Sequence, residues 1–210
     1  MKANADQEGQ DWMIDRAGKF TASRASDLMA KTKTGPSASR GNLIALLAVE
    51  RITGQPVETY QNAAMQRGIE TEAEARDAYS FHTGQAVQEA GFLPHPELAN
   101  VGCSPDGLLG EDGMLEIKCP ASMAKHLDSL RTGAHAKEYR WQLQHQLMVT
   151  GRAWVDAVSY DPRFPEGLQL SIVRVPRDED AIAELLAEIA KAEVEVEAVV
   201  AEMQTLAKAA

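Results

Sequence analysis

The sequence is poor in cysteine and has no long apolar run, and both absences narrow the class of protein. Only Cys103 and Cys119 occur among its 210 residues, and they form no Cys-x-x-Cys pair. A disulfide scaffold or a structural zinc site of several cysteines is therefore not expected. No stretch approaches the roughly 20 apolar residues of a membrane span, and the N-terminus lacks the apolar core of a secretory signal. These absences predict a soluble cytoplasmic protein with no membrane partner.

Positive charge is also scarce, since the formal net charge is −10. This balance argues against a nonspecific coat for nucleic acids. The negative charge is concentrated at the C-terminus, where residues 177–210 carry nine acidic and three basic side chains. Residues 1–40, in contrast, have seven basic and five acidic side chains. Because binding of a polyanion requires only a local basic surface, the net charge alone does not exclude a DNA-binding protein.

The distribution of apolar and turn-forming residues predicts helices on both sides of a compact mixed sheet. The fold class is α/β or α+β, and the length suits a single domain over residues 1–210. Residues 1–10 are polar and expected to be mobile. Residues 178–207 form a long amphipathic helix that packs on the core. Further helices are expected at 21–31, 40–52, 63–81, 121–131 and 137–149, and strands at 114–119, 153–160 and 168–175.

Two charged residues interrupt the short apolar strand in the middle of the chain. Side chains alternate between the faces of a strand, so Glu116 and Lys118 point to one side and Ile117 points to the other. The strand can therefore bury Leu115 and Ile117 in the core while the charged pair faces a cleft. An exposed strand with an ordinary surface Glu–Lys pair is the alternative interpretation.

A turn upstream of this strand brings a second carboxylate near the first. Residues 111–113 fit a three-residue hairpin loop with Gly113 in the left-handed conformation. That register places Asp106 opposite Lys118 and diagonal to Glu116, all on one face. A loop of four residues instead would put Asp106 on the other face. Two carboxylates beside an ammonium group suit Mg²⁺ or Mn²⁺, which activates water and stabilises charge on a phosphate that is being cleaved.

The Pro-Asp … Glu-x-Lys pattern resembles that of the PD-(D/E)xK nuclease superfamily. A set of landmarks in chain order is similar, more narrowly, to the lambda exonuclease family of phage-type recombination enzymes (YqaJ-like viral recombinases). Each landmark is weak alone, but the ordered set is specific and spans about residues 12–175. The landmarks are Arg16–Ser23, Gly68–Glu72, Cys103–Gly107, Leu115–Pro120, Gln142 and Tyr160–Arg163.

This resemblance implies a restriction-endonuclease-like core and a processive 5′-to-3′ exonuclease on double-stranded DNA. Such an enzyme releases mononucleotides and leaves a 3′ single strand for an annealing protein. It forms a ring-shaped homotrimer around the duplex, is encoded by a phage or prophage, and acts in the host cytoplasm. Two Mg²⁺ or Mn²⁺ ions are implied as cofactors.

The resemblance also implies a role for each matching residue. Asp106 and Glu116 look like metal ligands, together with Glu72 and the backbone carbonyl of Ile117. Lys118 looks like the residue that acts on the attacking water. The other roles implied are support of that lysine by Gln142, and binding of the 5′-phosphate by Arg16 and Ser23.

Several alternatives remain open at the level of the sequence. Glu70 can replace Glu72 as the ligand, and Gln144 or Gln146 can replace Gln142. The activity can instead be that of another PD-(D/E)xK nuclease, either an endonuclease or a single-strand exonuclease. Iron–sulfur members of that group need a cysteine cluster that this chain lacks. The chain can also be a nonenzymatic protein that binds DNA ends, although an intact set of carboxylates and lysine favours an enzyme.

Overall fold

The computed structural model describes residues 13–33, 35–57 and 63–209, without the side chains of residues 63–70. The expected mobile segment 1–10 lies outside the described residues. The chain divides into two compact units. Unit 1 is drawn from Met1–Glu58, Gly91–Ser104 and Asp178–Ala210, and unit 2 from Thr59–Ala90 and Pro105–Arg177. The single nuclease domain expected over residues 1–210 stays a prediction.

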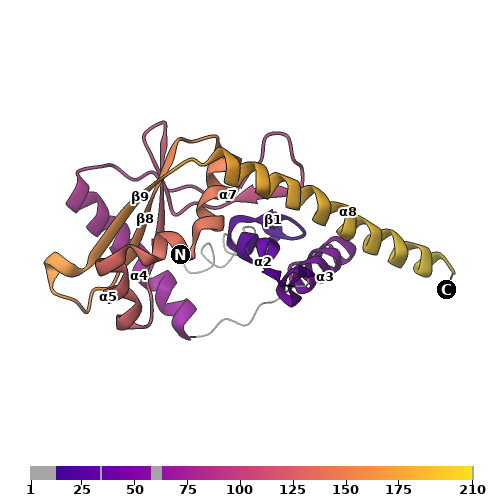
Figure 1. Cartoon of the computed structure of the whole chain (residues 1–210), viewed down its shortest axis with the longest axis horizontal. Coiled ribbons are helices and arrows are strands. Elements are labelled where there is room, and N and C mark those ends of the chain that lie inside the picture. Colours follow the sequence, from indigo (N-terminus) through magenta and orange to yellow (C-terminus); the bar gives the residue numbers. More distant parts are fainter. Residues whose placement is uncertain (1–12, 34, 58–62, 210) are drawn as a thin grey trace, which may run out of the picture. The chain divides into compact units, whose positions relative to one another are not determined.

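Unit 2 is built on a four-stranded mixed sheet, which confirms the predicted fold class (Figure 1). The strand order is β6 (Gly107–Leu109), β7 (Gly113–Lys118), β8 (Trp154–Tyr160) and β9 (Leu170–Pro176). β7 and β8 run parallel, whereas the two outer pairs are antiparallel. A parallel pair needs a crossover connection, and three helices supply it between β7 and β8.

Helices cover both faces of this sheet. On one face, α4 (Ala63–Thr83) contributes Ala75 and Tyr79 to a buried cluster with Leu115 and Ile117. The other face is covered by the crossover helices, which are α5 (Met123–Thr132), α6 (Ala134–Glu138) and α7 (Arg140–Thr150). Leu115 and Ile117 therefore enter the core as predicted. The helix expected at 137–149 is in fact divided between α6 and α7.

The hairpin between β6 and β7 has a different register from the predicted one. Leu109 pairs with Gly113 and Gly107 pairs with Leu115, so the loop consists of residues 110–112. An extension of this register places Asp106 level with Glu116, not with Lys118. The predicted register was therefore wrong, although the loop has the predicted length of three residues.

Two glycines explain this error. Gly110, and not Gly113, takes the left-handed conformation, with a φ of 55°. Gly113 is extended, and a Cβ atom on it would lie 2.3 Å from the Trp154 ring. Glycine at position 113 thus serves close packing against an aromatic ring from the neighbouring strand, a reason that the local sequence does not reveal.

Within its described residues, unit 1 combines two small sheets with helices. One sheet has the order β1 (Phe20–Thr21), β5 (Val101–Cys103), β4 (Leu93–Pro94), and β2 (Lys31–Thr32) pairs with β3 (Gly35–Pro36). The helices include α2 (Ala25–Met29), α3 (Ala38–Thr53) and α8 (Glu179–Ala209). The helix predicted at 21–31 is shorter than expected, because a 3₁₀ turn at Ala22–Arg24 precedes α2 and the β2–β3 hairpin follows it.

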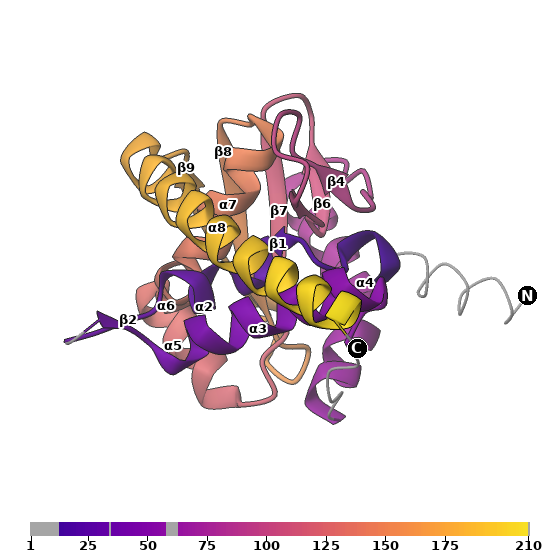
Figure 2. The same ribbon diagram turned by 90° about the vertical axis from the view of Figure 1, so that its right-hand side faces the viewer.

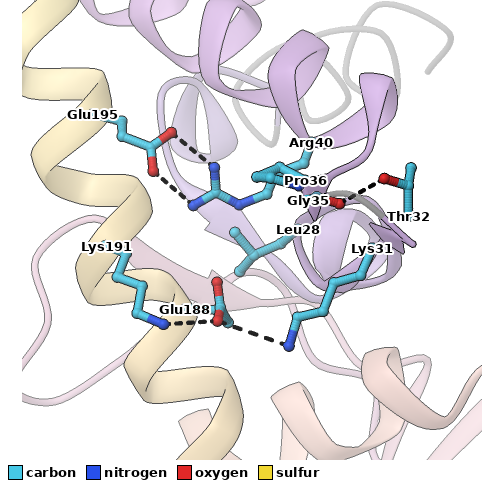
Figure 3. A pocket seen from close by; sticks show the side chains of 9 residues that line it. All are labelled: Leu28, Lys31, Thr32, Gly35, Pro36, Arg40, Glu188, Lys191 and Glu195. Carbon is cyan, nitrogen blue, oxygen red and sulfur yellow. Dashed lines mark hydrogen bonds and ion pairs between the residues drawn. The ribbon is translucent and has the colours of Figure 1, made fainter.

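Helix α8 lies beside α3, and both helices bury apolar side chains in the core of unit 1 (Figure 2). Ion pairs reinforce this packing around a cavity of about 340 Å³ (Figure 3). Arg40 donates two hydrogen bonds to Glu195, and Glu188 lies between Lys31 and Lys191. No helix in the described part of the chain is long and apolar enough to span a membrane.

Candidate active site

Glu116 of β7 is buried, although the sequence predicts that it faces a cleft. Only 3% of this residue is exposed, because α7 covers that face of the strand. Removal of a carboxylate from water costs several kcal/mol unless polar partners compensate. The alternative of an ordinary exposed Glu–Lys pair is therefore wrong.

Three donors compensate the buried carboxylate of Glu116. Lys118 Nζ lies 2.6 Å from Oε1, and the amide of Gln142 donates to the same oxygen. Gln146 donates to Oε2 at 2.5 Å. Gln144, in contrast, donates to the backbone carbonyl of Pro176 at 2.9 Å. Gln142 and Gln146 thus both belong to this group, and Gln144 does not.

Asp106 lies immediately before β6 and reaches the backbone of β7. Its Oδ2 accepts a hydrogen bond of 2.6 Å from the Ile117 N–H. Burial raises the pKa of Asp106 well above its usual value, and the nearby charges of Glu116 and Glu72 raise it further. Lys118 and the Ile117 N–H oppose this change only in part. The two carboxylates that the sequence places together are therefore close enough to repel each other.

Glu72 of α4 joins the same electrostatic group. Burial raises the pKa of Glu72, Arg76 lowers it, and Glu116 raises it again. Arg76 Nη2 lies 3.6 Å from Glu72, and its Nη1 donates to the Asp106 carbonyl at 3.2 Å. The side chain of the alternative ligand Glu70 lies outside the described residues. The structure therefore supports Glu72 as a member of this group but does not compare it with Glu70.

Lys118 is the cation of this group. Burial alone lowers the pKa of Lys118, but the charges of Glu116 and Asp106 outweigh burial and raise it. Its Nζ also lies 4.7 Å from the centroid of the Tyr139 ring, a favourable position for a cation. The ammonium group is thus charged near neutral pH, which suits a role in orienting water and stabilising negative charge.

The donor chemistry of this group fits a hard divalent cation. Asp106, Glu116 and Glu72 offer carboxylate oxygens, the ligands that Mg²⁺ and Mn²⁺ prefer. Their mutual repulsion, expressed in the raised pKa values of Asp106 and Glu72, is what a bound cation would relieve. Within the described residues, no three His, Cys, Asp or Glu side chains already lie in a metal-holding arrangement. Each carboxylate instead contacts its own partner, which is Ile117, Lys118 or Arg76.

Arg16 and Ser23 form a second polar group, in unit 1. Arg16 Nη2 donates to Ser23 Oγ at 2.8 Å, and Nη1 donates to Ser104 Oγ at 3.4 Å. The contact between Arg16 and Ser23 confirms that the two residues are neighbours. Ser104 is not among the predicted site residues, although it lies within the Cys103–Gly107 landmark. The helix N-terminus expected beside them is only a 3₁₀ turn followed by a five-residue helix.

The turn that carries Arg16 is fixed by the end of α3. Gly18 has a φ of 70°, its N–H donates to Glu50 at 2.8 Å, and its carbonyl accepts from Arg51 at 2.9 Å. Arg24 donates two further hydrogen bonds to Glu50. Burial raises the pKa of Glu50, but the hydrogen bonds from Arg24 and Gly18 outweigh burial and lower it. Glu50 therefore stabilises this turn as a carboxylate.

The Tyr160–Arg163 landmark supports the segment that follows β7. Asp161 is fully buried and accepts hydrogen bonds from Arg163. Arg163 in turn donates to the carbonyls of Pro120 and Ala121, at 3.4 and 3.0 Å. The landmark thus fixes the chain just after Lys118, a function that local sequence does not indicate.

Comparison with known proteins identifies the family. The family model of the YqaJ-like viral recombinase domain matches residues 11–153. The chain is 43% identical to an alkaline exonuclease (LHK-Exo) from Laribacter hongkongensis, and the match covers 95% of this chain and 99% of the other, with a TM-score of 0.87. A structure of LHK-Exo in complex with dAMP matches equally well.

A more distant structural match is the phage-related exonuclease from Haemophilus somnus 129PT. It is 15% identical, with a TM-score of 0.73 over 88% of this chain and 96% of the other, and shows a shared fold alone. No curated protein matches the sequence. The family model nevertheless covers most of the chain, and the LHK-Exo match extends over nearly all of it. The predicted resemblance is therefore confirmed, and this chain belongs to the family of the YqaJ-like viral recombinase domain.

Proposed function

We propose that this chain is a metal-dependent 5′-to-3′ exonuclease that degrades one strand of linear double-stranded DNA. The observation that carries the proposal is the buried Glu116 carboxylate, which lies against Lys118 and close to Asp106 and Glu72. The 43% identity to an alkaline exonuclease supports the same activity. LHK-Exo binds dAMP, a deoxynucleoside monophosphate, which agrees with release of mononucleotides by this chain.

The residues of unit 2 take distinct roles in this proposal. Asp106, Glu116, Glu72 and the Ile117 carbonyl would hold one or two Mg²⁺ or Mn²⁺ ions. The metal would supply an activated water and a counter-charge for the phosphate that is cleaved. Lys118 orients the attacking water and stabilises the developing negative charge, and Gln142 holds the Glu116 carboxylate beside it.

The polar group of unit 1 is proposed to bind a 5′-phosphate. An arginine fork binds phosphate oxygens through two parallel hydrogen bonds, and serine hydroxyls complete the set of donors. Arg16 and Ser23 are already in contact, and Ser104 adds a second hydroxyl to the guanidinium group. Selection of a 5′-phosphate would direct degradation from the 5′ end and leave 3′ single strands.

The proposal extends to assembly and partners. A ring closes when head-to-tail contacts between identical subunits repeat around an axis, and a ring that encircles DNA stays on it through many steps. We propose a homotrimer of this kind, which leaves 3′ strands for a single-strand annealing protein in the cytoplasm of the host cell.

Digestion of a linear duplex labelled at the 5′ or the 3′ end tests the proposed activity. With Mg²⁺, the 5′ label should appear first as a mononucleotide while the 3′-labelled strand remains long. Excess chelator should stop the reaction, because the carboxylates alone repel the phosphate backbone. Full activity in chelator would contradict the metal dependence. Internal cuts in circular DNA would favour an endonuclease of the same superfamily.

A further inference from the structure

Two glutamines of α7 divide the oxygens of Glu116 between them. Gln142 and Gln146 are four residues apart, so they project from the same face of the helix. Gln142 donates to Oε1, which also accepts from Lys118, and Gln146 donates to Oε2. The two oxygens of this carboxylate therefore have different surroundings.

The residues that contact the two oxygens of Glu116 also differ in how deeply they are buried. Gln146 has no exposed surface, and its amide donates to Glu116 Oε2 from within the core. Gln142 and Lys118, the partners of Oε1, are both partly exposed to solvent. The partner of Oε2 thus lies in the interior, whereas the partners of Oε1 reach solvent, from which a hydrated ion would have to come.

We infer that Gln146 is a positioning residue that holds Glu116 Oε2, so that Oε1 is the oxygen that Glu116 offers to a divalent cation. The inference rests on the proposed metal dependence and deepens it, because it assigns a ligand atom and the residue that orients it. Mutation of residues that hold ligating side chains through hydrogen bonds typically lowers metal affinity by about 10–100-fold.

The unsatisfied oxygen of Gln146 supports this role. Among the residues that the structure describes, Gln146 Oε1 is buried and has no hydrogen-bond partner, which is costly for the fold. An apolar side chain of similar size would avoid that cost. A turned amide would place Oε1 against Glu116, with two acceptors in contact, so the hydrogen-bond network fixes Nε2 as the donor. The hydrogen bond that Nε2 donates to Glu116 therefore explains why a glutamine occupies this position.

Titration of the DNA-free protein with Mn²⁺ by isothermal calorimetry tests the inference. Gln146→Met preserves the length of the side chain and removes the donor. The freed carboxylate can rotate away from the ligand position, so we expect the dissociation constant for Mn²⁺ to rise by about 10-fold or more. Gln146→Asn is a second variant in case Gln146→Met does not fold, because its shorter amide keeps a polar group but does not reach Oε2.

Two matched variants separate this role from general packing. Gln144→Met changes an equally buried glutamine of the same helix that bonds to Pro176, so its Mn²⁺ affinity should match that of the parent. Gln142→Met removes a donor from Oε1, the oxygen that the cation takes over, and should weaken binding less than Gln146→Met does.

The outcomes distinguish the inference from the proposed function. A parent protein that binds no Mn²⁺ overturns the metal-dependent activity itself. A parent that binds Mn²⁺ and a folded Gln146→Met variant with the same affinity overturn only the positioning role. A larger loss in Gln142→Met than in Gln146→Met would reverse the assignment of the two oxygens.

Discussion

A carboxylate on a strand between apolar residues is costly to bury, and Glu116 shows how the chain offsets this cost. Its two oxygens accept from Lys118, Gln142 and Gln146, all of which come from β7 or α7. Nearby Asp106 and Glu72 add negative charge that these donors do not neutralise. Metal-assisted hydrolysis requires such residual negative charge and an ammonium group at one place, and here the ammonium group of Lys118 is partly buried.

The first prediction concerns Lys118. Lys118→Ala should lower kcat by about 10²–10⁴-fold, because its charge interacts most strongly with the transition state. Binding of DNA with Ca²⁺ should persist, as measured by fluorescence anisotropy. Glu111→Ala changes an exposed residue of the β6–β7 loop and should leave kcat unchanged. A Lys118→Ala enzyme within a few-fold of the parent would mean that the lysine only neutralises Glu116.

The second prediction concerns Arg16. A charge-assisted hydrogen bond contributes about 1.5–3 kcal/mol, which corresponds to about 10–100-fold in rate. Duplexes with a 5′-phosphate should therefore be degraded faster than those with a 5′-hydroxyl, and Arg16→Ala should remove most of this difference. Lys208→Ala, which removes an exposed charge of the same unit, should preserve it. Equal rates on both ends in the parent enzyme would argue against a phosphate pocket at Arg16.

At the scale of elements, local patterns predict which strands and helices form, but not how they pair. Alternation along β7 correctly buries Leu115 and Ile117 and places Glu116 on the opposite face. The register with β6 was wrong because two glycines in one turn look alike in the sequence. The Trp154 ring, some forty residues later, explains why position 113 requires a glycine in extended conformation, whereas Gly110 takes the left-handed one.

The same limit applies to the candidate sites. Asp106, Glu116 and Lys118 lie in one short stretch, so the sequence indicates that they come together, although it does not fix their register. Ser104 and Gln146 contribute through contacts with residues far away in the chain, Arg16 and Glu116 respectively. A single sequence does not contain those distances, and polar residues on a helix such as α7 look the same whether they face water or a carboxylate.

The third prediction concerns the end of α3. The pKa of Glu50 is lower in the folded chain than its ordinary value of 4.5, because the hydrogen bonds from Arg24 and Gly18 outweigh the effect of burial. A lowered pKa stabilises the fold above the ordinary value, and this contribution is lost as the pH falls through the folded-state pKa. Glu50→Gln should therefore lower the free energy of unfolding by about 2 kcal/mol near neutral pH.

Urea unfolding at several pH values measures this effect. The difference between the parent and Glu50→Gln should be largest near pH 7 and should narrow below about pH 4.5. Glu202→Gln changes an exposed glutamate of α8 and should show no such dependence. A constant difference at all pH values would indicate that the shape of the side chain matters, and not its charge.

At the scale of the whole molecule, the proposed ring determines how far one enzyme travels on DNA. Light scattering should give a mass of about three times the chain mass of 22.8 kDa. Dilution that dissociates the ring should shorten the tracts that are degraded per binding event, because an open subunit leaves the duplex more easily. A monomer that still degrades long tracts without release would show that the ring is not the source of processivity.

The two units are interleaved along the chain, and this has a consequence for folding during synthesis on the ribosome. When synthesis reaches Arg177, unit 2 is complete and contains all the carboxylates of the candidate active site. Unit 1 at that point still lacks α8. That last helix carries Glu193 and Glu197, which hold Arg51 and through it the turn of Arg16. Translation thus completes the residues of the candidate active site before the last support of the turn that carries Arg16. Under the proposed function, a prematurely terminated chain would have the cutting residues without the full support of the proposed phosphate-binding turn, and completion of the final helix would be the step that restricts cutting to DNA ends.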